Sequence, residues 1–352
     1  MGKHNIITVF TAYWFKETVG FVNFFANTGY PTLLASFRTF YYYYKKFQLY
    51  FKNTLRAAPD VMRKNKHLTV YLFIAFSLSV LLSLFIGFTG GHVSRFILAG
   101  YFSMVIPAIA VLVIAIVYKD SVRNVAKKNI SVKWVFAAIF LIPTVIHIVC
   151  LPLLAYLTNG HLPWQPWLTP DKNGLYHSPE KIGWGVLTFT QLIFEIVKNA
   201  IVGLIIVSAL AFFEEVGWRA WMLPKLLSRF STKKAIAIGA AIWALWHLPF
   251  MLSGILYLNG ISSTQTAFIH PFGIFGAGII ISWLWLKTNS ILIASLAHGA
   301  LNNWGQYAFK FMEDNPANTQ NQLALFIGIN ATLFITGMIV LLRLTSRPAS
   351  YA

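Results

Sequence analysis

Residues 200–219 read AIVGLIIVSALAFFEEVGWR, and this stretch decides how the chain folds. The apolar run that contains it, about 187–213, is long enough to cross a bilayer as a helix, which takes about 20 residues. Glu214, Glu215 and Arg219 follow at its end. Ionisable groups at membrane depth are costly and are normally kept for function. The stretch therefore predicts a membrane-spanning helix that ends in a functional pair of carboxylates.

The composition of the whole chain agrees with a membrane protein. Of its 352 residues 57% are hydrophobic and only 11% are charged, whereas about a quarter are charged in soluble domains. We expect an all-α, polytopic membrane protein of about eight transmembrane helices, forming a domain over 68–346 with its core at about 186–305. The apolar stretches lie approximately at 68–89, 96–118, 134–157, 187–213, 235–253, 272–286, 290–305 and 324–343. The seventh stretch, 290–305, is short and need not cross the whole bilayer.

The formal net charge of +18 would suit a nucleic-acid partner in a soluble protein. Here the basic residues fall in alternate loops, as the positive-inside rule predicts, where they also attract anionic lipid headgroups. We therefore expect both termini to be cytoplasmic and no nucleic acid to be bound. Cys150 is the only cysteine, which excludes an internal disulfide.

Residues 1–67 precede the first apolar stretch and differ from it in composition. Aromatic residues and lysines crowd together from Phe40 to Phe47, and cations follow at Arg63, Lys64 and Lys66. Aromatic rings beside Lys and Arg suit the headgroup layer, so we expect an N-terminal cytoplasmic extension with one or two helices lying on the membrane surface. A partly disordered basic tail is the alternative.

The two adjacent carboxylates are expected to play different parts. On a continuous helix Glu215 lies beneath Arg219, because residues four apart share a face. Glu214 is rotated off that face by about a quarter turn and has no partner there. Glu214 would then be free to act as a general base in a low-dielectric site. The alternative is a solvated helix end with a surface ion pair.

Two later apolar stretches carry polar islands. Trp243 is followed by His247, just before Leu248 and Pro249, where the helix should break because proline disfavours helix at the preceding residue. His298 and Asn302 are four residues apart and share a helix face. For His247 the alternative is a structural histidine that bonds to a backbone carbonyl. For His298 and Asn302 the alternative is that the two polar side chains join neighbouring helices. His147 has no polar companion, and we interpret it as structural.

Together these islands resemble the CPBP family, which includes CAAX prenyl proteases of the Ras-converting type and bacteriocin-processing or immunity membrane proteins. The family pattern is Glu-Glu-x-x-x-Arg, aromatic-x-x-x-His and His-x-x-x-Asn or Asp. Here it is matched by Glu214 to Arg219, Trp243 to His247 and His298 to Asn302, although the middle motif usually begins with Phe. The resemblance covers about 186–305. It implies an intramembrane endopeptidase that opens to the cytoplasmic side.

The resemblance also implies roles for these residues. Glu214 and His247 would activate water, His298 and Asn302 would bind the oxyanion, and Glu215 and Arg219 would support the site. The substrate would be a membrane-associated or prenylated peptide or protein, and the bilayer the bacterial plasma membrane.

Other interpretations of the polar islands stay open. No cofactor is favoured, but zinc held by Glu214, His247 and His298 is an alternative, because two imidazoles, a carboxylate and a water can bind it. Asn302 is a poor zinc ligand, and no His-Glu-x-x-His helix is present. A non-catalytic bacteriocin-immunity or scaffold protein would keep the motifs while acting by binding. A proton-coupled transporter could use the same acid and histidines as a relay.

Overall fold

The computed structural model describes residues 66–120, 130–157, 168–178, 182–254, 261–305 and 319–345. The predicted interfacial extension, 1–67, lies outside the described residues except for Lys66 and His67, which begin the first described helix. Most of the basic loop that follows the second apolar stretch, 121–129, also lies outside them.

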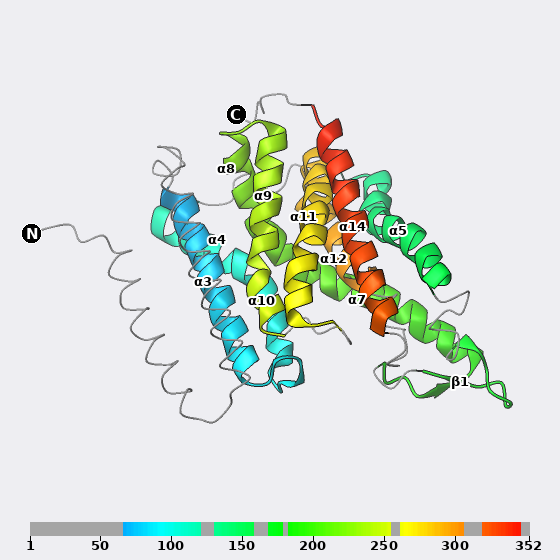
Figure 1. Cartoon of the computed structure of the whole chain (residues 1–352). Coiled ribbons are helices and arrows are strands. Elements are labelled where there is room, and N and C mark those ends of the chain that lie inside the picture. The colour runs from blue at the N-terminus through cyan, green and yellow to red at the C-terminus, as the bar shows by residue number, and fades with distance from the viewer. Residues whose placement is uncertain are drawn as a thin grey trace, which may run out of the picture. The chain divides into compact units, whose positions relative to one another are not determined.

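The described chain is helical almost throughout, as expected (Figure 1). Its strands form one small antiparallel ladder in the loop before α7, where Tyr176 pairs with Leu187 and His177 with Val186. In chain order the elements are α3 (Lys66–Phe88), η1 (Gly91–Val93), η2 (Ile97–Val105), α4 (Ile106–Tyr118), α5 (Val132–Leu157), β1 (Tyr176–His177), β2 (Val186–Leu187), α7 (Phe189–Glu215), η3 (Val216–Met222), α8 (Leu223–Leu227), α9 (Thr232–Trp246), α10 (Leu248–Leu252), α11 (Ser263–Thr288), α12 (Ile291–Trp304) and α14 (Thr319–Arg343).

Seven helical segments in the described part of the chain are long and apolar enough to cross a membrane. The chain is an all-α, polytopic membrane protein. The remaining predicted stretch, 290–305, forms α12, which has 14 residues. At a rise of 1.5 Å per residue it is about 21 Å long, short of a hydrocarbon core of about 30 Å. It is also largely buried among other helices, so its place is inside the bundle.

Local sequence explains where several helices begin and end. Thr188 and Gln191 form a reciprocal capping box at the start of α7, and Ser262 and Gln265 form another at the start of α11. Ser290 caps α12 by accepting a hydrogen bond from the Ile293 backbone N–H. These caps satisfy amide groups that a helix start otherwise leaves unpaired.

Two interruptions shape the helices that carry the polar islands. The chain between α9 and α10 breaks at His247, as the following Leu248 and Pro249 predict. At the end of α7 the helix continues into a π-helical segment, η3, which holds Arg219. Wide π turns inside helices often occur at functional sites. Figure 1 shows α7 running obliquely past the more parallel helices α3, α9 and α14.

Glycines let α11 and α14 approach closely. A Cβ atom on Gly276 would collide with the backbone of Leu333, and one on Gly337 would collide with the backbone of Gly276. Gly273 faces Asn330, whose amide oxygen also receives a hydrogen bond from His270 Nδ1, at 2.8 Å. Small residues permit such contacts between membrane helices, where packing rather than the hydrophobic effect drives association.

A polar cluster joins α3, α4 and α8 at one end of the bundle. Lys225 Nζ donates to both oxygens of Asp120, at 3.1 and 2.8 Å, and His67 Nδ1 lies 2.8 Å from Oδ2 of the same carboxylate. Burial alone would raise the pKa of Asp120, but the hydrogen bonds from Lys225 and His67 lower it below its ordinary value. The ionised carboxylate therefore holds the three segments together near neutral pH.

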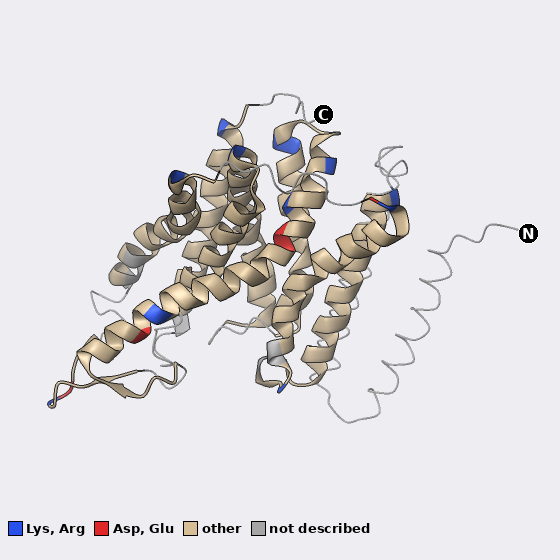
Figure 2. Ribbon diagram, turned by 180° about the vertical axis from the view of Figure 1, so that it is seen from behind, with Lys and Arg blue, Asp and Glu red and all other residues tan. Residues whose placement is uncertain are grey.

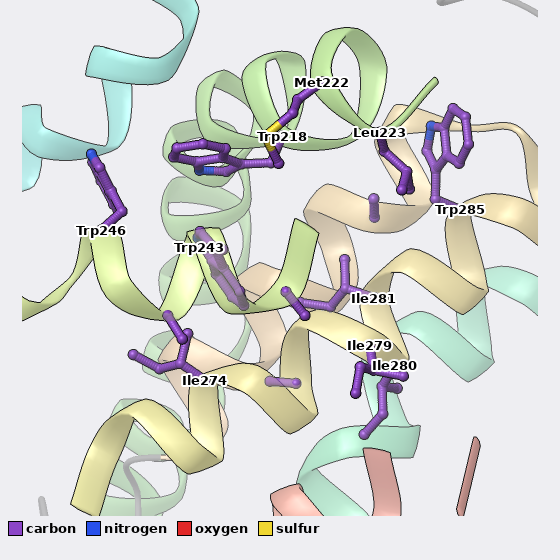
Figure 3. Packing of buried hydrophobic residues seen from close by; sticks show 14 of the residues in the cluster. Trp218, Met222, Leu223, Trp243, Trp246, Ile274, Ile279, Ile280, Ile281 and Trp285 are labelled. Carbon is purple, nitrogen blue, oxygen red and sulfur yellow. The ribbon is translucent and has the colours of Figure 1, made fainter. Parts of the chain in front are cut away.

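The charges are unevenly distributed along the bundle (Figure 2). Most of the Lys and Arg residues lie near helix ends, whereas an acidic segment of α7 lies in the middle of the bundle. Beside this segment, Trp218, Trp243 and Trp246 pack together with isoleucines of α11 in one hydrophobic cluster (Figure 3). The carboxylates at the end of α7 are therefore surrounded by aromatic and aliphatic side chains.

The α11–α14 contact makes a prediction about stability. Gly276→Ala should lower the free energy of unfolding by about 1–3 kcal/mol, because its new methyl group meets backbone that must move. Gly239→Ala is the matched control: it also lies within a helix, but its nearest neighbours are side-chain atoms at 3.6 Å or more. Thermal denaturation in detergent should show a clear loss for the first variant only. Equal melting temperatures would contradict the close packing.

Candidate active site

Glu214 and Glu215 lie at the end of α7 and are 2% and 0% exposed. The alternative of a solvated helix end is therefore wrong. Arg219, one turn further along in η3, is also buried, at 2%. A carboxylate or guanidinium is almost never buried to this extent unless it is paired, because desolvation of a charge is costly. The partners of these groups therefore define the site.

Glu215 accepts two hydrogen bonds on one oxygen. Arg219 Nη1 lies 2.9 Å from Glu215 Oε1, as the spacing of four residues predicts. His298 Nδ1 of α12 lies 2.9 Å from the same oxygen. Arg219 Nη2 also donates to the Gly278 carbonyl of α11, at 3.3 Å. This buried ion cluster, Glu215–Arg219–His298, thus joins α7, η3, α11 and α12.

Glu214 has a different environment. Its Oε2 accepts a hydrogen bond from the indole Nε1–H of Trp243 in α9, at 2.9 Å. The prediction that Glu214 would be left free was therefore wrong in part: it has no cationic hydrogen-bond partner, but it does have a neutral donor. The physical reason is that Trp243 stands where the family pattern usually has Phe, and only an indole carries an N–H.

His247 is anchored by a backbone carbonyl, the alternative that the sequence left open. Its Nδ1 lies 2.8 Å from the Trp243 carbonyl oxygen. Because a carbonyl oxygen can only accept, Nδ1 carries the proton. The other ring nitrogen, Nε2, is then an unprotonated acceptor in the neutral imidazole. His247 is only partly buried, so this arrangement fixes the ring and leaves Nε2 available as an acceptor.

The indole of Trp243 lies among the other polar groups. Its ring centroid is 5.3 Å from that of His247 and 5.1 Å from that of His298, both edge to face. The Arg219 guanidinium lies over the indole, 4.5 Å from its centroid. The predicted residues of three separate motifs therefore lie around one aromatic side chain.

Asn302 lies one turn beyond His298 on α12 and is partly exposed. Its side chain makes no hydrogen bond to another described residue, so the side-chain amide is available. Its neighbour Asn303, which the sequence did not single out, donates instead to the Ala200 carbonyl of α7, at 3.2 Å.

Close contacts set the position of α12 against α7. A Cβ atom on Gly299 would collide with the Ser208 hydroxyl, and one on Gly203 would meet the Asn303 amide. Gly299 thus permits a close approach of α12 to α7. This approach places His298 against Glu215. His147, interpreted as structural, has its Nδ1 2.6 Å from the Pro143 carbonyl oxygen.

The arrangement of donors does not fit a zinc site as it stands. Among the residues that the structure describes, no three His, Cys, Asp or Glu side chains are grouped so that they could hold a metal ion. Glu214 Oε2 is bonded to Trp243, and His298 Nδ1 to Glu215. Glu214 and His298 therefore bond to the Trp243 indole and to the Glu215 carboxylate.

Comparison with known proteins locates the same region of the chain. Residues 196–304 match the family described as type II CAAX prenyl endopeptidase Rce1-like. The Rce1-like segment includes all the site residues predicted above, from Glu214 to Asn302, so the resemblance seen in the sequence motifs is confirmed.

A curated relative matches part of the chain. CAAX prenyl protease 2 of Methanococcus maripaludis is 36% identical over 95 residues, which are 26% of this chain and 35% of the relative. The match thus spans about a third of the length of that relative.

The two carboxylates should respond differently to neutralisation. Glu215→Gln leaves the buried charge of Arg219 uncompensated and should cost about 3–5 kcal/mol of stability. Glu214→Gln keeps an acceptor for the Trp243 N–H and removes a buried charge, so its stability should stay within about 1 kcal/mol of the wild type. Thermal denaturation of both purified variants measures this. A more severe loss for Glu214→Gln would contradict the assignment of partners.

Proposed function

We propose that this chain is an intramembrane endopeptidase that hydrolyses peptide bonds of membrane-associated substrates. The observation that carries the proposal is the position of Trp243, which bonds to Glu214 and contacts the rings of both His247 and His298. Peptide hydrolysis needs a base that deprotonates water and donors aimed at the developing oxyanion. The site offers groups of both kinds. The match of residues 196–304 to a protease family supports the same reaction.

Glu214 and His247 would activate the water. Glu214 Oε1 has no hydrogen-bond partner among the described residues, while Oε2 is held by Trp243. His247 presents Nε2 as an acceptor, because Nδ1–H donates to the Trp243 carbonyl. A water between these two acceptors could donate both its protons and be polarised for attack.

His298 and Asn302 would bind the oxyanion. The Asn302 side-chain amide is a donor without a described partner. His298 already donates from Nδ1 to Glu215, so it must carry a second proton on Nε2 to donate to an oxyanion. Glu215 would orient the ring for this task, as a buried carboxylate does for the histidine of a hydrolytic triad. Arg219 would hold Glu215 in place.

The substrate we propose is a peptide or protein tail anchored in the bilayer, with a prenylated C-terminus as the first class to test. The name of the curated relative, CAAX prenyl protease 2, supports that class. The ends of α8, α9 and α14 that carry Lys225, Lys233, Lys234 and Arg343 would face the cytoplasm and anionic lipid, by the positive-inside rule. Glu214 lies about two to three turns from Lys225 along the helix, at 1.5 Å per residue, so the site would open to that side.

Cleavage of a quenched, farnesylated peptide with a C-terminal CAAX sequence by the purified chain tests the proposal. Glu214→Ala and His247→Ala should each lower the rate by about 10²–10⁴-fold, the usual contribution of general-base catalysis. Asn302→Ala should lower it by about 10²–10³-fold, as loss of an oxyanion donor does.

Two matched controls separate chemistry from folding. Glu195→Ala removes another carboxylate of α7, one that is paired with Lys198 near the helix start, and should leave the rate unchanged. Asn303→Ala removes the neighbouring amide, which bonds to α7, and should lower thermal stability while the rate per folded molecule is kept. Full activity of Glu214→Ala would end the proposal. Protection of cells by a well-expressed Glu214→Gln variant would favour a binding or immunity role.

We further propose that the reaction uses no metal ion, because no three His, Cys, Asp or Glu side chains of the described residues are grouped as metal ligands and Asn302 is a poor zinc ligand. Metal analysis of the purified, active chain should find no stoichiometric zinc, and dialysis against a chelator should leave cleavage unchanged. Stoichiometric zinc that is lost together with activity, and that restores activity when added back, would reverse this proposal in favour of a zinc mechanism.

A further inference from the structure

The hydrogen bond between Trp243 and Glu214 distinguishes this chain from the pattern of its family. That pattern usually has Phe at this position, and a phenyl ring cannot donate a hydrogen bond. Here the indole Nε1–H lies 2.9 Å from Glu214 Oε2, and both residues are 2% exposed. A hydrogen bond to a carboxylate is shorter and stronger than a hydrogen bond between two neutral groups.

We propose that Trp243 is a positioning residue for the catalytic base: its indole N–H fixes one oxygen of Glu214 and thereby directs the other toward the attacking water. This inference rests on the proposed function, because it concerns the carboxylate that would activate water. Trp243 does not itself touch the reacting atoms in this scheme. It acts through Glu214.

The indole is held firmly enough to serve as a fixed donor. The Arg219 guanidinium covers the indole, 4.5 Å from its centroid, and the two imidazoles meet it edge to face. On the side of α11, a Cβ atom added to Gly278 would lie 3.0 Å from Trp243 Cε3, so the glycine permits this close packing. Neighbours on several sides therefore restrict rotation of the ring, and the N–H has one direction in which to donate.

The other tryptophans in the buried cluster do not share this arrangement. Trp246 Nε1 donates to the backbone carbonyl of Ala75, at 3.2 Å, and so joins α9 to α3. Trp218 Nε1 and Trp221 Nε1 have no hydrogen-bond partner among the described residues. Within this cluster, as far as the structure describes it, only Trp243 donates to a carboxylate. A general role of indoles in packing does not account for that bond.

Trp243→Phe is the direct test, because it keeps an aromatic ring and removes the N–H. With the farnesylated CAAX peptide as probe, kcat should fall by about 10- to 100-fold, the range that a loosely held catalytic group can cost. KM should change by less than about threefold, since a group that acts only in the chemical step does not alter ground-state binding.

Trp246→Phe is the matched control. It removes an equally buried indole N–H from the same helix, but one bonded to backbone, and its ring contact with His247 can be kept. It should retain kcat within about threefold of the wild type, because it leaves Glu214 and its donor in place. Thermal denaturation of both variants shows whether they are comparably folded.

Combining Trp243→Phe with Glu214→Asp tests whether Trp243 acts through Glu214. In Glu214→Asp the shorter carboxylate is withdrawn from the indole, so adding Trp243→Phe should lower kcat by less than about threefold further, a non-additive result. A purely structural tryptophan would lower kcat by the same factor in both backgrounds.

The outcomes distinguish this inference from the proposed function. If cleavage depends on Glu214 but Trp243→Phe retains full kcat, the endopeptidase proposal stands and the positioning role is overturned. Equal losses of kcat in Trp243→Phe and Trp246→Phe would also overturn it, since they would reflect packing alone. If the probe is not cleaved in a Glu214-dependent manner, both the proposed function and this inference fall.

Discussion

The structure depends on the burial of one ion cluster, Glu215–Arg219–His298. Taking a carboxylate and a guanidinium out of water costs several kcal/mol for each ion, and only good geometry with further hydrogen bonds offsets that cost. Glu215 meets this requirement by accepting from both Arg219 and His298, while the second nitrogen of Arg219 donates to a carbonyl of α11. Helices far apart in the sequence must therefore stay in register, because any shift would leave a buried charge unpaired.

This constraint gives two adjacent carboxylates different chemistry. Glu215 is bound to an arginine and a histidine, so it is committed to holding the site together. Glu214, one residue earlier, points to α9 and meets the single N–H of Trp243. Glu214 lies among aromatic rings and keeps Oε1 without a described partner; Glu215 likewise keeps Oε2, so the two carboxylates differ in their donors. A fixed carboxylate in such surroundings is more suited to accept a proton than one that is free in solvent. Gly278 allows α11 to approach α9 closely, and Gly299 allows α12 to approach α7 closely. These contacts make the arrangement possible.

Much of the fold could be predicted from sequence because it depends on local properties. Hydropathy and length determine membrane spans, and the residue before Pro249 marks the break at His247. The pairing of Glu215 with Arg219 follows from helical periodicity alone. Family motifs predicted the site residues, and the segment matched by the family model includes those motifs. The membrane-surface role expected for residues 1–67 stays a prediction.

The contacts between helices could not be predicted in the same way. Nothing in the spacing of His298 indicates that it shares an oxygen of Glu215 with Arg219, because that bond depends on how α12 packs on α7. The bond from Trp243 to Glu214 was missed for the same reason. The one available signal was the Trp in place of the usual Phe, which adds an N–H that needs an acceptor. The π-helical turn of η3 has no signal in the sequence that we recognise.

The central claim is that the residues around Trp243 form a hydrolytic site in the membrane. The most direct measurement compares, by mass spectrometry, the peptides released from membranes of cells that express the wild-type chain and of cells that express Glu214→Ala at the same level. The account predicts a defined set of peptides that are released only with the wild-type chain, with their uncleaved precursors retained in the variant. Identical peptide sets from the two strains, with both chains folded and in the membrane, would contradict it.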